Sequence, residues 1–388
     1  MRKASLFFGR RAGVALALAA FAVLLPSCAP KGEWPPAAPA DLGDTFYAAR
    51  ATAAGAELVA VAAAGVKPLG VPCDGESQVA VSPDGAFLFF GADSVLHQYE
   101  LKTGRDRVVL SFPAGVAREM GTEGEQKDKV LSWRCGFRFR DVVFAPDGRL
   151  AVLAEPASCP QAETRPEDYT AAERAAWKPR AAFAADAGAY LVFPGGKPEY
   201  VGPTRALYGF ADDKTLVLEN KLTAASYELA HGDVRPFLAK DAHEVGWLPV
   251  GVVAPGRAVL VGAKARERSL KDIMNRVYVV EGSRGKDKPL VAIKTREPAT
   301  RAALSPDGRY LAVETTPQVL GPAKIFIVDL KSRQFRLLAV GARLFRFARG
   351  SRAVYYLGGE GRAGDLFLAG LDGTSRRLTT SGDVLPLP

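Results

Sequence analysis

The sequence predicts an all-β fold, a seven-bladed β-propeller with a short helical insertion. Three observations support this prediction. A β-hairpin motif recurs along the chain, its shortest spacing of 43 residues is the length of one four-stranded blade, and the two ends of the chain each resemble part of one further blade. Six blades are the alternative, because six copies of the hairpin motif can be counted.

The hairpin motif is clearest at residues 303–313, where two apolar runs flank a Ser-Pro-Asp-Gly turn. Pro306 fixes φ at the first central position of a turn, and the Asp307 side chain can accept a hydrogen bond from its own downstream backbone. Gly308 tolerates a positive φ. The chain is therefore expected to reverse here, as it is at the similar residues 81–88 and 144–150.

The residue before this turn recurs six times, at Ser82, Ala145, Ala211, Ala254, Ser305 and Ala348. The gaps are 63, 66, 43, 51 and 43 residues, so the longer repeats must contain insertions. A second hairpin follows in each repeat, most clearly at 365–379 around Leu-Asp-Gly-Thr. With both turns, the repeat resembles the WD40-like propeller repeats of TolB and its relatives over residues 46–388. The resemblance implies a propeller that binds a protein or a peptidoglycan-associated partner in the cell envelope.

The two ends of the chain are expected to complete one blade. Residues 46–69 look like strands two to four of a blade, and residues 382–387 stand where the innermost strand of the next blade should begin. We therefore expect the ring to close by pairing of the N- and C-terminal strands.

Three insertions distinguish one face of the predicted propeller: 112–135, 156–189 and 263–276. They follow the fourth strand of one blade or join the second and third strands of another, and these connections emerge on the same face. The opposite face has only tight turns. Within the second insertion, residues 166–177 begin with proline, followed by acidic residues and alanines, which predicts a short helix.

The N-terminus predicts export. Basic residues precede an apolar stretch at 12–25 that is too short to span a bilayer comfortably. The stretch ends Leu-Pro-Ser-Cys, which resembles the lipobox of bacterial lipoproteins and implies lipidation of Cys28; a plain secretory signal is the alternative. The expected organisation is a signal peptide at 1–27, a Pro- and Ala-rich tether at 28–43 and a propeller domain at 44–388. Ala29 lacks the carboxylate that would retain a lipoprotein at the inner membrane, so the resemblance implies an outer-membrane location, facing the periplasm or the cell surface.

Charge argues against a nucleic-acid partner. The whole chain has 51 Lys and Arg against 42 Asp and Glu, and removal of the signal leaves 47 against 42, a net charge of +5. This small excess is dispersed, and no basic run is interleaved with aromatic residues. We expect a monomer that meets the membrane only through its lipid anchor.

Motifs for common enzyme chemistry are missing from the sequence. It contains no Gly-x-Ser-x-Gly elbow, no phosphate-binding glycine loop, no His-Glu-x-x-His and no paired Cys-x-x-Cys. We therefore expect no catalytic, cofactor-binding or metal-binding residues. The turn aspartates are expected to bond the turn backbone. His97 and His231 are expected to be structural.

Recognition is expected on the face with the insertions. Trp133, Arg134 and Trp177 lie in inserted loops that need not contribute to the blade core, and Trp and Arg are enriched at binding hot spots. His243, which is flanked by carboxylates, is expected on the same face. The alternative function is a propeller hydrolase or lyase with a polar site at the mouth of the central channel. Three or more convergent titratable side chains there would favour the enzyme.

The cysteines predict one disulfide. Cys135 and Cys159 each lie twelve residues from Asp147 at the centre of a hairpin, so antiparallel pairing brings them near each other. An exported protein can keep such a bond. Cys73 is expected to be free, and a Cys73–Cys135 bond between adjacent blades is the alternative.

Overall fold

The structure is a computed structural model of the chain, which divides into two compact units, Met1–Glu33 and Trp34–Pro388. All described residues belong to the second unit: 45–62, 65–112, 115–120, 130–145, 147–157, 187–193, 196–220, 223–228, 232–236, 247–249, 252–254, 257–264, 276–281, 291–294, 297, 299–317, 321–359 and 363–385. In β8, β9 and β16–β22 only the backbone is described. The described residues form thirty strands and no helix, and they include no helix long and apolar enough to cross a membrane.

Five antiparallel sheets have four strands each, paired in chain order. The first contains β4 (Ala80–Val81), β5 (Phe87–Ala92), β6 (Val95–Glu100) and β7 (Asp106–Ser111). The second contains β10 (Phe137–Phe144), β11 (Leu150–Pro156), β12 (Gly188–Val192) and β13 (Glu199–Gly202). The third contains β14 (Leu207–Phe210), β15 (Thr215–Asn220), β16 (Thr223–Glu228) and β17 (Asp233–Pro236).

The fourth of these sheets contains β23 (Ala299–Leu304), β24 (Tyr310–Thr315), β25 (Lys324–Asp329) and β26 (Gln334–Val340). The fifth contains β27 (Ala342–Phe347), β28 (Ala353–Gly358), β29 (Asp365–Gly370) and β30 (Ser375–Arg377). This is the up-and-down order expected of propeller blades.

Two further sheets differ from the four-stranded pattern. The N-terminal sheet has three strands, β1 (Phe46–Thr52), β2 (Gly55–Ala62) and β3 (Gly65–Cys73). The other contains β18 (Trp247–Pro249), β19 (Val252–Ala254), β20 (Arg257–Lys264), β21 (Arg276–Glu281) and β22 (Val291–Lys294), and both β18 and β19 pair with β20. Among the described residues, five blades are thus complete with four strands, where the sequence predicts seven blades.

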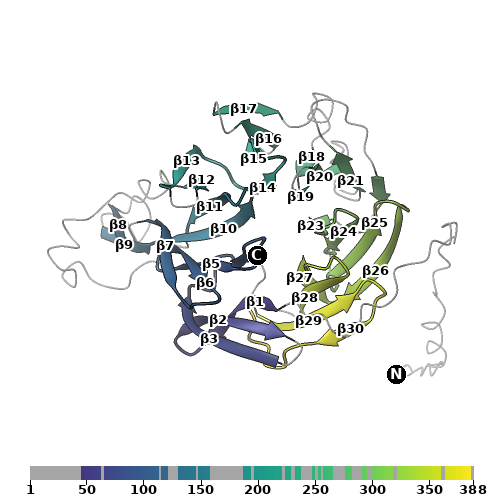
Figure 1. The fold of residues 1–388 in the computed structure, drawn as a ribbon, viewed down its shortest axis with the longest axis horizontal. Helices are drawn as coiled ribbons and strands as arrows, with labels where there is room; N and C mark the ends of the chain where they lie inside the picture. Colours follow the sequence, from purple (N-terminus) through teal and green to yellow (C-terminus); the bar gives the residue numbers. More distant parts are fainter. Residues whose placement is uncertain are drawn as a thin grey trace, which may run out of the picture. The chain divides into compact units, whose positions relative to one another are not determined.

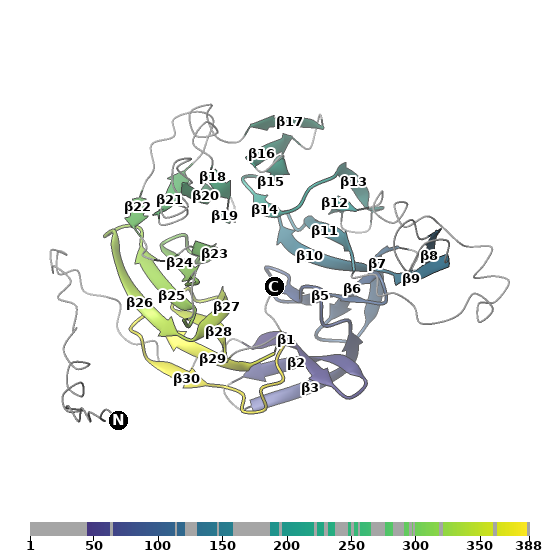
Figure 2. The ribbon, with the colours of Figure 1, turned by 180° about the vertical axis from the view of Figure 1, so that it is seen from behind.

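The sheets succeed one another around a ring, with β1, β10, β14, β19, β23 and β27 toward the centre (Figures 1 and 2). Inner strands of successive sheets contact one another, from β10 to β14, β19, β23 and β27. A buried cluster then joins the last sheet to the first, with Tyr355 and Leu368 packed together with Phe46 and Val59. The arrangement is that of a β-propeller.

The predicted turn chemistry is confirmed at the first hairpin of the blades. Asp307 Oδ1 accepts hydrogen bonds from Ser305 Oγ at 2.6 Å and from the Arg309 amide at 3.1 Å, and Gly308 has φ +68°. Asp84 forms the equivalent bonds with Ser82 Oγ and the Ala86 amide. These aspartates bond the turn backbone, as expected, because an Asx turn satisfies local amides that have no ladder partner.

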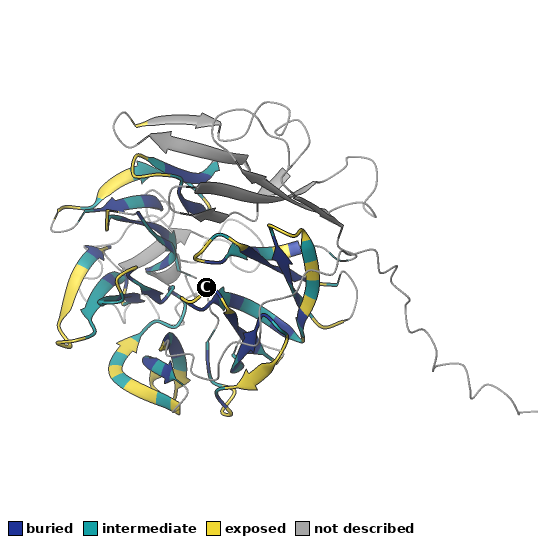
Figure 3. Cartoon of the chain, turned by 45° about the vertical axis from the view of Figure 1, so that its right-hand side comes forward, coloured by how far each residue is buried: buried dark blue, intermediate teal, exposed yellow. Residues whose placement is uncertain are grey.

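The core lies between adjacent sheets, and the outermost strands face solvent (Figure 3). Phe139, Phe210 and Phe345 on inner strands are almost fully buried, whereas Val108 on β7 and Phe335 on β26 are more than half exposed. Flat sheets stacked around a ring bury both faces of their inner strands and leave only the rim in water.

The two ends of the chain pair as predicted, over residues 383–385. The Ala51 amide donates to Asp383 O at 2.9 Å and the Leu385 amide donates to Ala49 O at 3.0 Å. Val384 is 1% exposed and also pairs with Gly364 at the start of β29. The C-terminal segment thus connects the N-terminal sheet with the last blade, although through isolated bridges rather than a regular strand.

The three insertions leave the blades where predicted. The first contains a hairpin of β8 (Gly115–Met120) and β9 (Val130–Cys135) between β7 and β10. The second joins β11 to β12, and the third joins β20 to β21. The predicted helix at 166–177 lies outside the described residues.

The closure can be tested with Val384→Ala. This substitution removes two buried methyl groups at the junction of the first sheet and the last, so the free energy of unfolding should fall by about 2 kcal/mol. Val108→Ala on the exposed edge of β7 is the matched control and should change it by less than about 0.5 kcal/mol. Equal effects of the two substitutions in urea unfolding would show that the C-terminal segment does not hold the ring.

Candidate functional site

The predicted binding residues lie mostly beyond what the structure describes. Trp133 and Arg134 are on β9, where the backbone pairs Trp133 with Ala117 and Arg134 with Val116. Trp177 and His243 lie outside the described residues, and so does His231. The structure therefore places Trp133 and Arg134 on an inserted hairpin, as predicted, and leaves their contacts undescribed.

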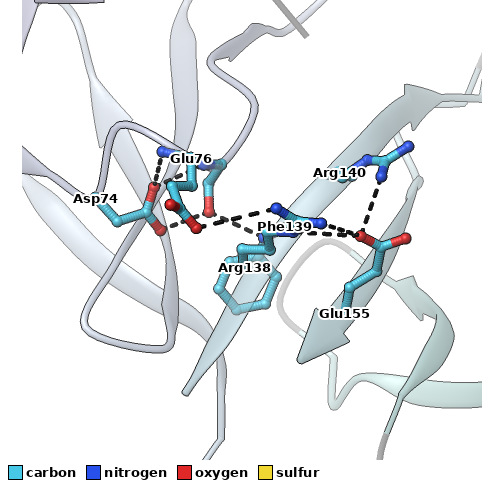
Figure 4. Close-up of polar contacts among 7 residues, drawn as sticks. Asp74, Glu76, Arg138, Phe139, Arg140 and Glu155 are labelled. Carbon is cyan, nitrogen blue, oxygen red and sulfur yellow. Dashed lines mark hydrogen bonds and ion pairs between the residues drawn. The ribbon is translucent and has the colours of Figure 1, made fainter. Parts of the chain in front are cut away.

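A polar network holds the described roots of two insertions (Figure 4). Glu155 Oε2 lies 3.1 Å from a guanidinium nitrogen of both Arg138 and Arg140, and Arg138 also lies 4.0 Å from Glu76 in the segment that leads into β4. Arg138 and Arg140 follow the inserted hairpin, and Glu155 precedes the second insertion. This network links two sheets at the base of the face with the insertions.

Ser77 makes the second contact between these sheets. Its hydroxyl donates to Asp74 Oδ2 at 2.6 Å, and its oxygen accepts a hydrogen bond from the Phe139 amide at 2.9 Å. Burial raises the pKa of Asp74, against the effect of the hydrogen bonds from Ser77 and Glu76. The arrangement in Figure 4 is therefore a structural junction between blades.

The cysteines are partly described. Cys73 is a free thiol, as predicted, and burial raises its pKa to about 11. The alternative Cys73–Cys135 bond is not formed. In the β10–β11 hairpin Phe137 pairs with Pro156, and the Ala157 amide donates to Gly136 O at 2.8 Å. Cys159 lies outside the described residues, so the Cys135–Cys159 bond stays a prediction.

His97 is a packed residue, as expected. Its ring stacks on Phe90 with centroids 5.1 Å apart, and Nδ1 lies 2.8 Å from Asp106 Oδ2. Among the described residues, no group of three or more His, Cys, Asp or Glu side chains could hold a metal ion.

Irregular inner strands carry a set of polar residues that the sequence interpretation did not select. The register shifts between Arg140 and Val143 on β10, between Leu207 and Gly209 on β14, and between Arg343 and Arg346 on β27. Such bulges free backbone amides from the ladder and redirect side chains. A buried amide without an acceptor costs about 1–3 kcal/mol, so each freed amide needs a partner.

Side chains of adjacent sheets supply these partners. Gln78 Oε1 accepts from the Val142 amide at 2.6 Å, and Glu314 Oε2 accepts from the Leu344 amide at 2.7 Å. Asp141 Oδ2 accepts from the Leu207 amide of the third four-stranded sheet at 3.1 Å. In all three cases one blade accepts a hydrogen bond from the inner strand of the next. We call these three contacts the inter-blade caps.

Arginines lie beside the caps. Burial lowers the pKa of Arg301, while the charges of Glu314 and Asp141 oppose that shift. Burial also lowers the pKa of Arg346 to about 10, and repulsion from Arg301 adds to the effect. Burial raises the pKa of Asp141. These groups are thus close enough for their charges to act on one another, and Arg346 remains cationic at neutral pH.

The carboxylates of this inner cluster are engaged in hydrogen bonds. Asp141 and Glu314 are each engaged by a backbone amide, and Glu314 also accepts from Thr300 Oγ1 at 3.2 Å. Burial raises the pKa of Tyr208, so its hydroxyl stays neutral. The cluster has the titratable groups expected for the enzyme alternative, but its two carboxylates accept hydrogen bonds that join blades.

A repeat position could have revealed part of this cluster. Gln78, Asp141 and Arg301 each stand four residues before the turn residue of their repeat, in strands that are otherwise largely apolar. A polar residue at this position is a detectable signal. The partners of Gln78 and Asp141, however, lie 64 and 66 residues away and depend on how the blades stack.

The fold defines a β-propeller, and comparisons with known proteins agree. An oligogalacturonate lyase in complex with manganese is 13% identical, with a TM-score of 0.53 over 85% of this chain and 86% of that chain. The oligogalacturonate lyase from Vibrio parahaemolyticus is 12% identical, with a TM-score of 0.53 over 85% and 87%.

TolB from Acinetobacter baumannii is 14% identical over 88% of this chain and 81% of that chain, with a TM-score of 0.45. At these identities the likeness to the two lyases shows the fold alone, and the lower TM-score with TolB carries no argument. No family model and no curated protein sequence matches the chain.

The inter-blade cap at Asp141 predicts a graded effect of substitution. Asp141→Ala should lower the free energy of unfolding by about 1–3 kcal/mol, because the Leu207 amide loses its acceptor. Asp141→Asn keeps an oxygen acceptor and should lower the free energy of unfolding by clearly less than Asp141→Ala does. Asp213→Ala, an exposed turn position, is the control. Equal losses for Ala and Asn in urea unfolding would contradict the capping role.

Proposed function

We propose that the chain is an exported, lipid-anchored propeller of seven blades that binds a protein or peptidoglycan-associated partner in the cell envelope. The blade count rests on adding the three-stranded N-terminal sheet, completed by the C-terminal segment, and the β18–β22 sheet to the five four-stranded blades. The anchor rests on the sequence around Cys28, and the outer membrane is its proposed location.

One observation carries the binding role: the three long connections leave the blades at equivalent edges. They follow β7, β11 and β20, whereas the opposite hairpins, such as β10–β11 and β23–β24, close through short Asp-Gly turns. Connections can lengthen without disturbing the blades, so recognition is commonly placed on such a face. The rigid junction at Arg138, Arg140 and Glu155 holds the roots of two of these connections and limits the entropy lost on binding.

A propeller lyase or hydrolase is the second candidate. It is favoured by the convergence of charged groups near Asp141, Arg301 and Arg346. The two lyases of similar fold suggest an acidic oligosaccharide as the substrate to try. Release of an unsaturated product from oligogalacturonate, with and without Mn²⁺, would support this candidate over the binding role.

Lipid anchoring can be tested with Cys28→Ser. The substitution removes the thiol that carries the lipid, so the protein should move from the membrane fraction to the soluble envelope fraction. Mass analysis of the N-terminal peptide of the unmodified chain should show the lipid. Unchanged fractionation together with an unlipidated N-terminus would contradict the proposal.

Partner binding can be tested with Trp133→Ala and Trp177→Ala. Each should reduce capture of crosslinked envelope partners at least tenfold while the melting temperature stays within about 2 °C, because hot-spot aromatics contribute more to binding than to the blade core. Phe335→Ala removes an exposed aromatic from β26 on the rim and should leave capture unchanged. If capture depends instead on the Asp-Gly turns, the binding face is the opposite one.

A further inference from the structure

A cavity of about 290 Å³ lies where the inner strands reach the short turns. Inner strands or adjoining residues of four sheets contribute to it: β1, β4, β10 and β27. It is thus at the opposite edge of the blades from the long connections. The described lining residues include Arg346 and Arg349 and no carboxylate.

Arg346 gives the cavity its charge. It projects from β27, is enclosed by protein and still has part of its surface open to the cavity. Its Nη1 donates to Val79 O, a neutral acceptor, at 3.0 Å. Among the described residues, no carboxylate forms an ion pair with Arg346, and the charge that most affects it is that of Arg301, which is repulsive. A guanidinium has five N–H donors, so an anion in the cavity could be bound and would relieve this repulsion.

Arg349 adds a second cation at the rim. It is exposed, and its Nη2 lies 3.4 Å from Ser82 O. Arg349 and Tyr47 both line the cavity, and the charge of Arg349 opposes the rise in the pKa of Tyr47 that burial produces. Asp84 is also close to Arg349, but its carboxylate accepts hydrogen bonds from Ser82 and Ala86 within the turn.

Aromatic and aliphatic side chains form part of the cavity wall. Tyr47, Val81 and Phe144 line it and are only partly buried, and the Gln78 amide oxygen is already used in an inter-blade cap. A ligand with an anionic group for the arginines and a compact apolar body for Tyr47 and Phe144 matches this mixed lining.

We propose that this cavity binds a small organic anion whose single carboxylate or phosphate group contacts Arg346 and whose apolar body lies against Tyr47 and Phe144. The proposal does not depend on the partner proposed above, because the cavity and the long connections are at opposite edges of the blades.

Calorimetric titration at neutral pH with phenylacetate, phenyl phosphate and the neutral phenylacetamide tests the proposal on the unmodified chain. At least one of the two anions should bind at least tenfold more tightly than the amide, since only the anions can form charge-assisted bonds with the guanidinium. Comparison of the two anions identifies whether carboxylate or phosphate is preferred. Equal binding of acid and amide, or no binding of either anion, would overturn the proposal.

Substitutions assign the effect to Arg346. Arg346→Gln should weaken binding of the preferred anion at least tenfold, and Arg346→Lys should retain part of the affinity because it keeps the charge. Arg343→Gln is the matched control on the same strand, where Arg343 bonds Gly359 O and Ala363 O instead. If Arg346→Gln fails to fold, Arg346→Lys and Arg349→Gln still give the comparison. Unchanged affinity in both Arg346→Lys and Arg349→Gln would show that the anion binds elsewhere. Neither of these two variants should alter capture of the envelope partner.

Discussion

The hydrogen bond between a side chain of one blade and a bulged inner strand of the next is the interaction on which the structure depends. The side chains of Gln78, Asp141 and Glu314 each accept a hydrogen bond from a backbone amide of the following sheet. Hydrophobic packing between sheets can tolerate a small slide, because it has no preferred direction. A hydrogen bond to a single freed amide is directional and does not tolerate such a slide. The inter-blade caps therefore fix how each blade is placed against its neighbour.

This constraint explains why charged residues lie in the middle of the ring without forming an obvious catalytic centre. Asp141 and Glu314 are held in place by amides, and their charges partly offset that of Arg301. Arg346 lies further toward the short turns and bonds only a neutral carbonyl among the described groups. The same arrangement of strands therefore produces balanced charge at the caps and an excess of positive charge at the cavity beside them.

The two edges of the blades have different physical characters. At the edge with the long connections, the described contacts are ion pairs such as Arg138 with Glu155, which join neighbouring elements and leave the added chain to supply recognition. At the other edge, the turns are closed by their own aspartates, and Arg346 and the residues around it line a cavity. The two proposed binding regions therefore lie at opposite edges of the blades.

The sequence alone determined the hairpins, their order and the pairing of the two chain ends. Ser-Pro-Asp-Gly specifies a turn through contacts within five residues, so the Asp307 turn could be predicted without knowledge of the fold. The inner cluster could not be predicted in this way, although the polar residues at 78, 141 and 301 share one repeat position. Asp141 meets Leu207 and Arg346 meets Val79 only after the blades have stacked around the ring. These contacts join residues 66 and 267 positions apart, and only the tertiary structure brings such residues together.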